Sequence, residues 1–259
     1  MVTQDKLNIA VIQANLMWED VDANLSRLEA SIGKCVDTDL IVLPEMFSTG
    51  FSMKPEALAI HAEKTLLWMA QQAAKKDALL CGSLIVKEDE QYCNRFIWML
   101  PSGEWGSYDK RHLFRMGGEH EVYAAGKKQK TFVWKGWRIA PFVCYDLRFP
   151  VWSRNRNHFD LMIYVANWPA ARNRVWETLL QARAIENQCY LVGANRVGTD
   201  VNGVEHCGNS MVVDARGVIQ NELVSNKEAI ISSCIDKKSL ETFREKFPVY
   251  LDADDFSIS

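Results

Sequence analysis

The sequence lacks the features that mark secreted, membrane-embedded or modular proteins. No apolar run reaches the roughly 18 residues of a membrane-spanning helix, and the start MVTQDKLNIA lacks the basic-then-apolar pattern of a signal peptide. Only 7 prolines and 14 glycines occur in 259 residues, and no linker-like segment, charge block or repeat divides the chain. We therefore expect one soluble, cytoplasmic domain spanning residues 1–259.

An excess of one charge is also absent. The 30 basic residues stand against 33 acidic ones, and the formal net charge is −3. This balance gives no sequence-wide attraction to nucleic acid or to an anionic membrane, and neither is expected as a partner.

Paired cysteines are missing too. The seven cysteines form no Cys-x-x-Cys pair, are odd in number and lie far apart, which argues against a disulfide framework and a zinc ribbon. They are Cys35, Cys81, Cys93, Cys144, Cys189, Cys207 and Cys234. Most should be small buried hydrophobic side chains, so a reactive thiol among them would be an exception.

What the sequence does contain is an alternation of short apolar runs with longer helical patterns. Strands are expected at 7–14, 39–45, 79–86, 95–100, 105–110, 137–144, 161–167, 189–197, 209–214, 217–223 and 229–236. Helices are expected at about 21–33, 57–76 and 172–187, after Pro150 and at the C-terminus. Strands 39–43 and 161–166 are apolar on both faces and need cover on both sides, which favours an α/β fold of mixed sheets layered with helices.

Three reactive side chains stand where apolar strands end. Glu45 follows Ile-Val-Leu-Pro, Lys110 follows a hairpin, and Cys144 follows Ala-Pro-Phe-Val. A carboxylate can take the proton of a thiol nucleophile and return it to a leaving amine, and an ammonium group can stabilise an oxyanion. Taken singly, each residue is more often a helix cap, a solvated charge or a packing thiol, so chemistry alone makes the trio a plausible site only.

The sequence segments around these residues resemble the motifs of a known family. LPEMFSTGF, YDKRHLF and VCYDLRFP look like the three catalytic motifs of the nitrilase superfamily of carbon–nitrogen hydrolases, in the family's order. The resemblance implies a four-layer α-β-β-α sandwich with two central mixed sheets, a homodimer or larger homo-oligomer, and catalysis without a metal or organic cofactor.

The resemblance also implies roles. Cys144 is expected to be the nucleophile, Glu45 the proton carrier and Lys110 an oxyanion donor, with the Tyr145 backbone N–H as the second donor. A further glutamate near the lysine is expected at Glu119, with the neighbouring Glu121 as the alternative.

Within the superfamily, segments 143–155, 165–188 and 206–214 look most like the bacterial omega-amidase branch. That branch deamidates 2-oxoglutaramate and 2-oxosuccinamate and is associated with methionine salvage. Such a substrate carries a carboxylate remote from its amide, which suits an arginine.

Several residues are expected to surround the pocket. Arg172 and Arg174 lie in a loop that should border it, and we predict that Arg172 either binds the substrate carboxylate or forms an ion pair. Phe51 and Trp168 could form its walls, although aromatic residues often only pack. Arg148 is expected to pair with a carboxylate beneath Cys144.

Other functions stay open at this point: another amidase branch, acting on N-carbamoyl or aliphatic amides, a non-catalytic interaction protein on the same fold, and a thiol redox protein. His112, close to Lys110, could suggest a Cys–His protease, but the residues that surround the cysteine in papain-like proteases are absent. The remaining histidines, His61, His120, His158 and His206, show no metal-binding spacing.

Overall fold

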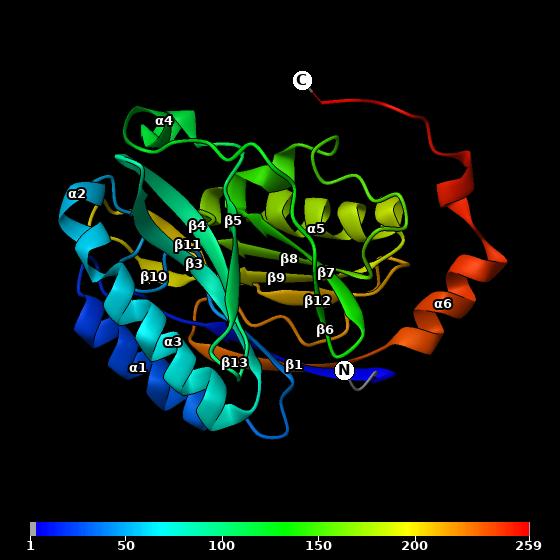
Figure 1. The fold of residues 1–259 in the computed structure, drawn as a ribbon, viewed down its shortest axis with the longest axis horizontal. Coiled ribbons are helices and arrows are strands. Elements are labelled where there is room, and N and C mark those ends of the chain that lie inside the picture. The colour runs from blue at the N-terminus through cyan, green and yellow to red at the C-terminus, as the bar shows by residue number, and fades with distance from the viewer. Residues whose placement is uncertain (1–3, 259) are drawn as a thin grey trace.

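The computed structural model describes residues 4–258 as two β-sheets packed face to face and covered by helices (Figure 1). The strands are β1 Lys6–Gln13, β2 Leu40–Val42, β3 Leu79–Glu88, β4 Gln91–Met99, β5 Trp105–Asp109, β6 Phe132–Trp134, β7 Trp137–Val143, β8 Leu161–Ala166, β9 Tyr190–Asn195, β10 Val197–Thr199, β11 Glu205–Cys207, β12 Met211–Val213 and β13 Ala229–Asp236. The α-helices are α1 Val21–Gly33, α2 Pro55–Leu58, α3 Ala62–Lys76, α4 Glu119–Val122, α5 Asn173–Asn187 and α6 Lys237–Lys246. Short 3₁₀ turns are η1 Ala59–His61, η2 Arg115–Gly117, η3 Cys144–Arg148, η4 Ala170–Arg172 and η5 Val249–Asp252.

Both large sheets are mixed. One has six strands in the order β13-β1-β2-β3-β4-β5, and the other has five in the order β12-β9-β8-β7-β6. Parallel pairing joins β1, β2 and β3 in the first sheet and β7, β8 and β9 in the second, while the outer strands pair antiparallel. The carboxyl ends of the parallel strands in each sheet therefore lie at one edge.

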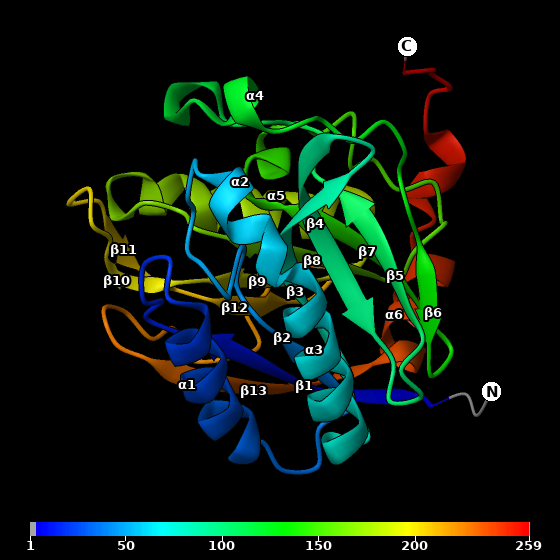
Figure 2. The ribbon, with the colours of Figure 1, turned by 60° about the vertical axis from the view of Figure 1, so that its left-hand side comes forward.

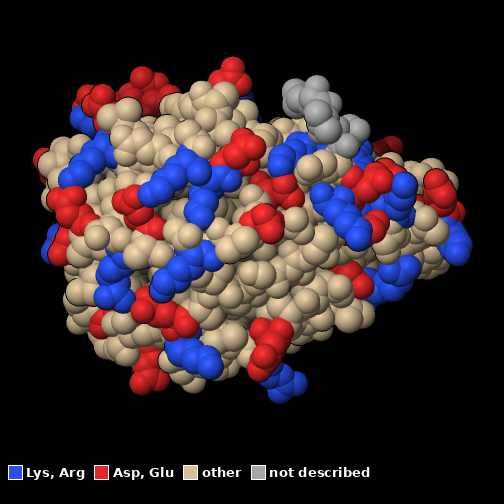
Figure 3. Space-filling model, turned by 90° about the horizontal axis from the view of Figure 1, so that it is seen from below, with Lys and Arg blue, Asp and Glu red and all other residues tan. Residues whose placement is uncertain are grey.

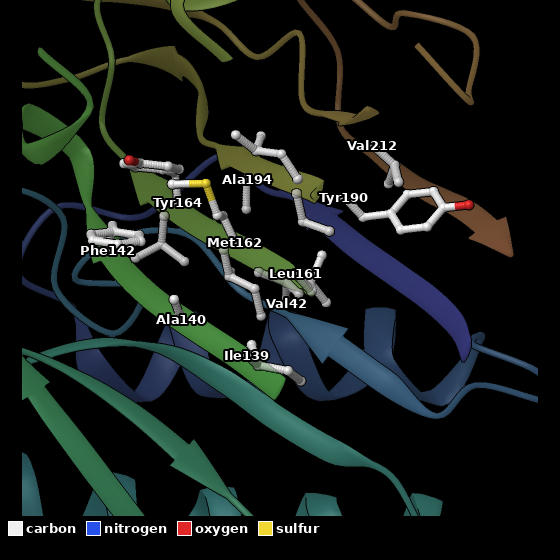
Figure 4. Packing of buried hydrophobic residues seen from close by; sticks show 14 of the residues in the cluster. Val42, Ile139, Ala140, Phe142, Leu161, Met162, Tyr164, Tyr190, Ala194 and Val212 are labelled. Carbon is white, nitrogen blue, oxygen red and sulfur yellow. The ribbon is translucent and has the colours of Figure 1, made fainter. Parts of the chain in front are cut away.

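The layers follow from which faces are apolar. Helices α1 and α3 lie side by side over the six-stranded sheet, and α5 covers the five-stranded sheet (Figures 1 and 2). One core cluster includes Val42 of β2 and Ile139 of β7 between the sheets, and it continues on the other face of the five-stranded sheet, where Phe142 of β7 lies on the side that α5 covers. In Figure 4, Phe142 lies beside Tyr164 of β8, and their rings stack with centroids 4.9 Å apart. The expected layered sandwich with two central mixed sheets is confirmed.

The sequence predictions were wrong for a few short elements. The short helix expected after Pro150 is absent, and a 3₁₀ turn occupies Cys144–Arg148 instead, because Asp146 accepts a hydrogen bond from the Val143 backbone N–H and starts the turn there. The strand expected at 189–197 is split at Arg196 into β9 and β10. The strand expected at 217–223 makes only one bridge, Val213 to Ile219, since the Asn221 side chain takes the Val212 N–H that a ladder would need.

The surface agrees with the balanced charge. On the face shown in Figure 3, acidic and basic side chains alternate without a large patch of either sign. No helix within residues 4–258 is both long enough and apolar enough to span a membrane.

Candidate active site

The strand ends of both sheets contribute to one polar cluster in the interior. Glu45 follows β2 after Leu43 and Pro44, Lys110 directly follows β5, and Cys144 directly follows β7. Glu45 and Lys110 are fully buried, and Cys144 is partly exposed. The three residues that the sequence singled out are thus brought together, although 99 positions separate Glu45 from Cys144 in the chain.

Lys110 lies at the centre of this cluster. Its ammonium nitrogen Nζ donates to Glu45 Oε1 at 2.9 Å and to both carboxylate oxygens of Glu119 at 2.9 Å. Burial lowers the pKa of Lys110, but the charges of Glu119 and Glu45 outweigh it and the pKa is raised. Lys110 is therefore a permanent cation with two carboxylates beside it.

The two oxygens of Glu45 have different surroundings. Oε1 accepts from Lys110 at 2.9 Å and from the side-chain amide of Asn94 at 2.8 Å. Oε2 accepts from the backbone N–H of Asn167 at 2.8 Å and, at the longer distance of 3.3 Å, from its side chain. Each oxygen therefore accepts two hydrogen bonds, and the longest of the four, at 3.3 Å, is the one from the Asn167 side chain to Oε2. Because long hydrogen bonds are weak, Oε2 is the oxygen that can more easily accept a proton.

Cys144 has the properties of a protonated thiol held in a strained turn. Its φ is +44°, a left-handed conformation that costs a non-glycine residue energy and is often found at functional sites. Burial, followed by the charge of Glu45, raises the pKa of the thiol well above its ordinary value, and Lys110 opposes this only in part. The thiol is therefore neutral at physiological pH and must lose its proton to a neighbouring base in order to react.

Glu119, rather than Glu121, is the second carboxylate of the cluster. Glu119 is fully buried on Lys110, and its Oε2 also accepts the Phe114 backbone N–H at 2.6 Å. Burial and then the like charge of Glu45 raise its pKa, against the opposing charge of Lys110. Glu121 is exposed.

The turn that carries Cys144 is tied to the loop that carries Lys110. Buried Asp146 accepts from the Tyr108 hydroxyl at 2.8 Å, and its other oxygen accepts the His112 backbone N–H at 3.0 Å. The His112 ring nitrogen Nδ1 lies 2.8 Å from the same Asp146 oxygen, and the ring stacks on Phe149. His112 thus pairs with Asp146, which gives it a structural place and leaves no support for a Cys–His protease.

The second oxyanion donor expected at Tyr145 fits the local backbone. Tyr145 is the second residue of the 3₁₀ turn that begins at Cys144. The first N–H groups of a helical turn have no acceptor within that turn, so the Tyr145 N–H is available beside the thiol. Its ring packs edge-on against Phe114 at 5.2 Å between centroids.

The expected pocket residues lie around this cluster in different ways. Phe51 is half-buried, and its ring centroid lies 5.2 Å from Lys110 Nζ. Trp168 is buried and donates from its ring to the Arg172 carbonyl at 2.9 Å. The Arg172 guanidinium lies over the Phe114 ring at 5.4 Å, whereas Arg174 is exposed.

The expectation for Arg148 was wrong. Arg148 is exposed and lies over the Trp168 ring at 5.3 Å, and within residues 4–258 it makes no ion pair. The carboxylate beneath Cys144 is Asp146, and neutral and histidine donors already surround it, which leaves an arginine no role there.

Sequence reasoning missed two asparagines of the site. Asn94 lies within β4 and Asn167 follows β8, and both donate to Glu45. Asn167 could have been noticed, because it ends an apolar strand as Glu45 and Cys144 do. Asn94 sits inside a strand, and its sequence neighbours give no comparable signal.

No group of three or more potential metal ligands gathers anywhere in the described part of the chain.

Comparison with known proteins gives a consistent result. The carbon–nitrogen hydrolase family model matches residues 8–245. The chain is 46% identical to omega-amidase YafV of Yersinia enterocolitica over 96% of this chain and 98% of that protein, and 29% identical to the 2-oxoglutaramate amidase of Bacillus subtilis over 95% and 97%. Among solved structures, it resembles XC1258 of Xanthomonas campestris, a CN-hydrolase superfamily protein with an arsenic adduct in its active site. The TM-score is 0.96, with 40% identity and coverage of 99% of this chain and 100% of that one.

Proposed function

This chain belongs to the carbon–nitrogen hydrolase family, and we propose that it is an omega-amidase. It hydrolyses the terminal amide of 2-oxoglutaramate or 2-oxosuccinamate to the 2-oxo dicarboxylate and ammonia. The relatives named omega-amidase and 2-oxoglutaramate amidase support this substrate class. The observation that carries the chemistry is the buried Lys110, held between Glu45 and Glu119 beside a strained, protonated Cys144.

Acylation begins when the Cys144 sulfur attacks the amide carbon and its proton moves to Glu45. Oε2 is proposed as the receiving oxygen, because the two donors of Oε1 lie at 2.8 and 2.9 Å, whereas one of the two donors of Oε2 lies at 3.3 Å. The carbonyl oxygen becomes an oxyanion that Lys110 and the Tyr145 N–H stabilise. When the intermediate collapses, the carbon–nitrogen bond breaks, Glu45 passes the proton to the leaving nitrogen, and ammonia departs from a thioester.

Deacylation repeats the proton path with water. Glu45 takes a proton from a water molecule while the water oxygen attacks the thioester carbon. Lys110 and the Tyr145 N–H again stabilise the oxyanion that forms. Collapse breaks the carbon–sulfur bond, and the proton on Glu45 returns to the Cys144 sulfur. Glu119 does not exchange a proton in this scheme, and its charge keeps Lys110 in place.

Arg172 is proposed to bind the remote carboxylate of the substrate. It is half-buried, its carbonyl is fixed by Trp168, and it forms no ion pair within residues 4–258. An arginine without a carboxylate partner beside the pocket can offer a planar pair of donors. Phe51 and Trp168 are proposed as apolar walls.

Ammonia release from a panel of amides tests the substrate. We expect kcat/KM for 2-oxoglutaramate to exceed that for aliphatic amides of similar length by at least about 100-fold, since a site with a donor for the substrate carboxylate rejects ligands that leave this donor unpaired. Arg172→Gln should remove most of that difference, and exposed Arg174→Gln should keep it. Equal rates on 2-oxoglutaramate and simple amides would refute the omega-amidase assignment and favour another amidase of the family.

Three further expectations stay predictions. We propose a homodimer whose interface covers exposed apolar residues near the C-terminus, such as Phe247 and Leu251. Sedimentation would measure it. A cytoplasmic location and a place in methionine salvage are proposed on the resemblance alone.

A further inference from the structure

The feature that leads beyond the proposed function is Asn94. It is fully buried in β4, where its backbone carbonyl accepts the N–H of Lys110 at 3.0 Å. Its side-chain nitrogen Nδ2 donates to Glu45 Oε1 at 2.8 Å and to Glu119 Oε1 at 3.1 Å. One residue therefore contacts the lysine and both glutamates.

The other end of the same side chain has no partner. Asn94 Oδ1 is buried and accepts no hydrogen bond within the described residues. Leaving a buried acceptor unsatisfied is unfavourable, and at Asn94 the two hydrogen bonds from its nitrogen to carboxylates offset that cost. The carboxamide is oriented by what its nitrogen does for the two carboxylates.

Asn155 shows what a structural asparagine looks like in the same protein. It is also buried, but its nitrogen donates to two carbonyls, of Phe159 and Asn187, and its oxygen accepts the N–H groups of His158 and Phe159. Every polar atom of the Asn155 side chain is satisfied, and it lies away from the catalytic cluster.

We propose that Asn94 is a positioning residue of the reaction, which holds Glu45 and Glu119 together and leaves Glu45 Oε2 as the oxygen that exchanges a proton with Cys144. Its amide fills the second acceptor position of Oε1, after Lys110 has filled the first. Without it, Oε1 regains a free position, the carboxylate can rotate, and the two like charges lose a shared donor. The inference rests on the proposed roles of Cys144 and Glu45.

The test compares Asn94→Leu with Asn155→Leu in the full-length enzyme. Asn94→Leu should lower kcat/KM for ammonia release at least about tenfold. The low-pH limb of the rate profile should also move up by about 1 pH unit, since a lost hydrogen bond to a carboxylate raises its pKa. Asn155→Leu should lower the thermal unfolding midpoint and leave the pH profile in place. If Asn94→Leu does not fold, Asn94→Ser, which is shorter and keeps a hydroxyl, should show the same displacement.

A second readout separates this inference from the substrate assignment. The alkylation rate of Cys144 by iodoacetamide, measured against pH without substrate, should also shift upward in pH in the Asn94 variant. If the wild type does not prefer 2-oxoglutaramate but the alkylation profile shifts, only the substrate assignment fails. Unshifted profiles in both measurements, or kcat/KM within twofold of the wild type, would overturn the role of Asn94.

Discussion

At the scale of single residues, the site depends on the balance of charge around Lys110. One cation is buried with two carboxylates, Glu45 and Glu119, at 2.9 Å. A buried charge cluster of this kind contributes little net stability when complete, but removal of one partner leaves the others uncompensated.

We predict that Lys110→Met destabilises the fold by about 3–5 kcal/mol near pH 8 and by less near pH 5. Burial and the charge of Glu45 already raise the pKa of Glu119, and without the opposing charge of Lys110 it would lie further above its unfolded value. The penalty is therefore complete above the folded pKa of Glu119 and shrinks as falling pH protonates that carboxylate. Denaturant unfolding at the two pH values measures it. Lys54→Met, which removes an exposed ion pair with Glu19, should change stability by less than about 0.5 kcal/mol. An equal loss at both pH values would contradict the charge argument.

The buried side chain of His206, outside the catalytic cluster, leads us to predict a second pH effect on the stability of the fold. Burial, and then the charge of Arg196, lower the pKa of His206 to about 4. The unfolded chain thus binds a proton more readily, so this contribution to stability is complete above about pH 6.5 and is lost as pH falls toward 4. Between pH 7.5 and 5, the wild type should lose about 2 kcal/mol that His206→Gln keeps. If the free energy of unfolding fell equally with pH in the wild type and in His206→Gln, the assigned role of His206 would be wrong.

How much of the site the sequence could predict depends on what surrounds each residue. Glu45, Lys110 and Cys144 lie at strand ends within recognisable sequence motifs, and the structure brings them together. Asn94 lies inside a strand, and its contacts are with residues 49 and 25 positions away, so only the folded chain shows its use. The carboxylate expected to pair with Arg148 beneath Cys144 is Asp146, and it is already satisfied by Tyr108 and His112.

At the scale of elements, the turn after β7 fixes the nucleophile. The φ of +44° at Cys144 is held by Asp146, which accepts the Val143 and His112 N–H groups and the Tyr108 hydroxyl. The aspartate replaces the backbone hydrogen bonds that a strained turn gives up.

We predict that Asp146→Ala lowers kcat at least about tenfold and destabilises the protein by about 3 kcal/mol, because several buried donors lose their acceptor at once. Tyr108→Phe removes one donor to Asp146 and should have a smaller effect on both. Ammonia release and denaturant unfolding measure the two quantities. A kcat of Asp146→Ala near that of the wild type would show that the turn holds its shape without the carboxylate.

The contact of α5 with β9 predicts a matched pair of glycine substitutions. A Cβ on Gly193 would lie 2.5 Å from a methyl group of Leu180 and 2.9 Å from the Trp176 ring, so α5 would have to shift. Gly193→Ala should cost about 1–3 kcal/mol. Gly33→Ala, at the end of α1 with nothing within 4 Å of the new Cβ, should be neutral or slightly stabilising. Thermal melts compare them, and equal midpoints would contradict the close packing.

The elements were predictable where periodicity was strong and failed where side chains compete with the backbone. α1 and the hairpin of β4 and β5 fall where the pattern placed them. The strand expected at 217–223 failed because Asn221 accepts the Val212 N–H that a ladder would need. The helix expected after Pro150 is replaced by the turn at Cys144, where Asp146 accepts the Val143 N–H. Neither side-chain bond leaves a periodic signal.

At the scale of the whole molecule, the fold places strand ends of the two sheets next to each other. β2 and β5 of one sheet and β7 and β8 of the other deliver Glu45, Lys110, Cys144 and Asn167 to one interior cluster. Strands that are apolar on both of their faces predicted a layered fold from the sequence alone. Which strand ends would face one another could not be read from periodicity, because that depends on how residues between the sheets, such as Val42 and Ile139, pack.

The central claim is that Cys144 attacks the amide with Glu45 as its proton carrier. The most direct test is ammonia release from 2-oxoglutaramate by Cys144→Ala, with its fold checked by circular dichroism and thermal melting. The account predicts a folded variant whose turnover falls at least about 1,000-fold, because no other side chain can form the acyl intermediate. A folded variant with the activity of the wild type would contradict it.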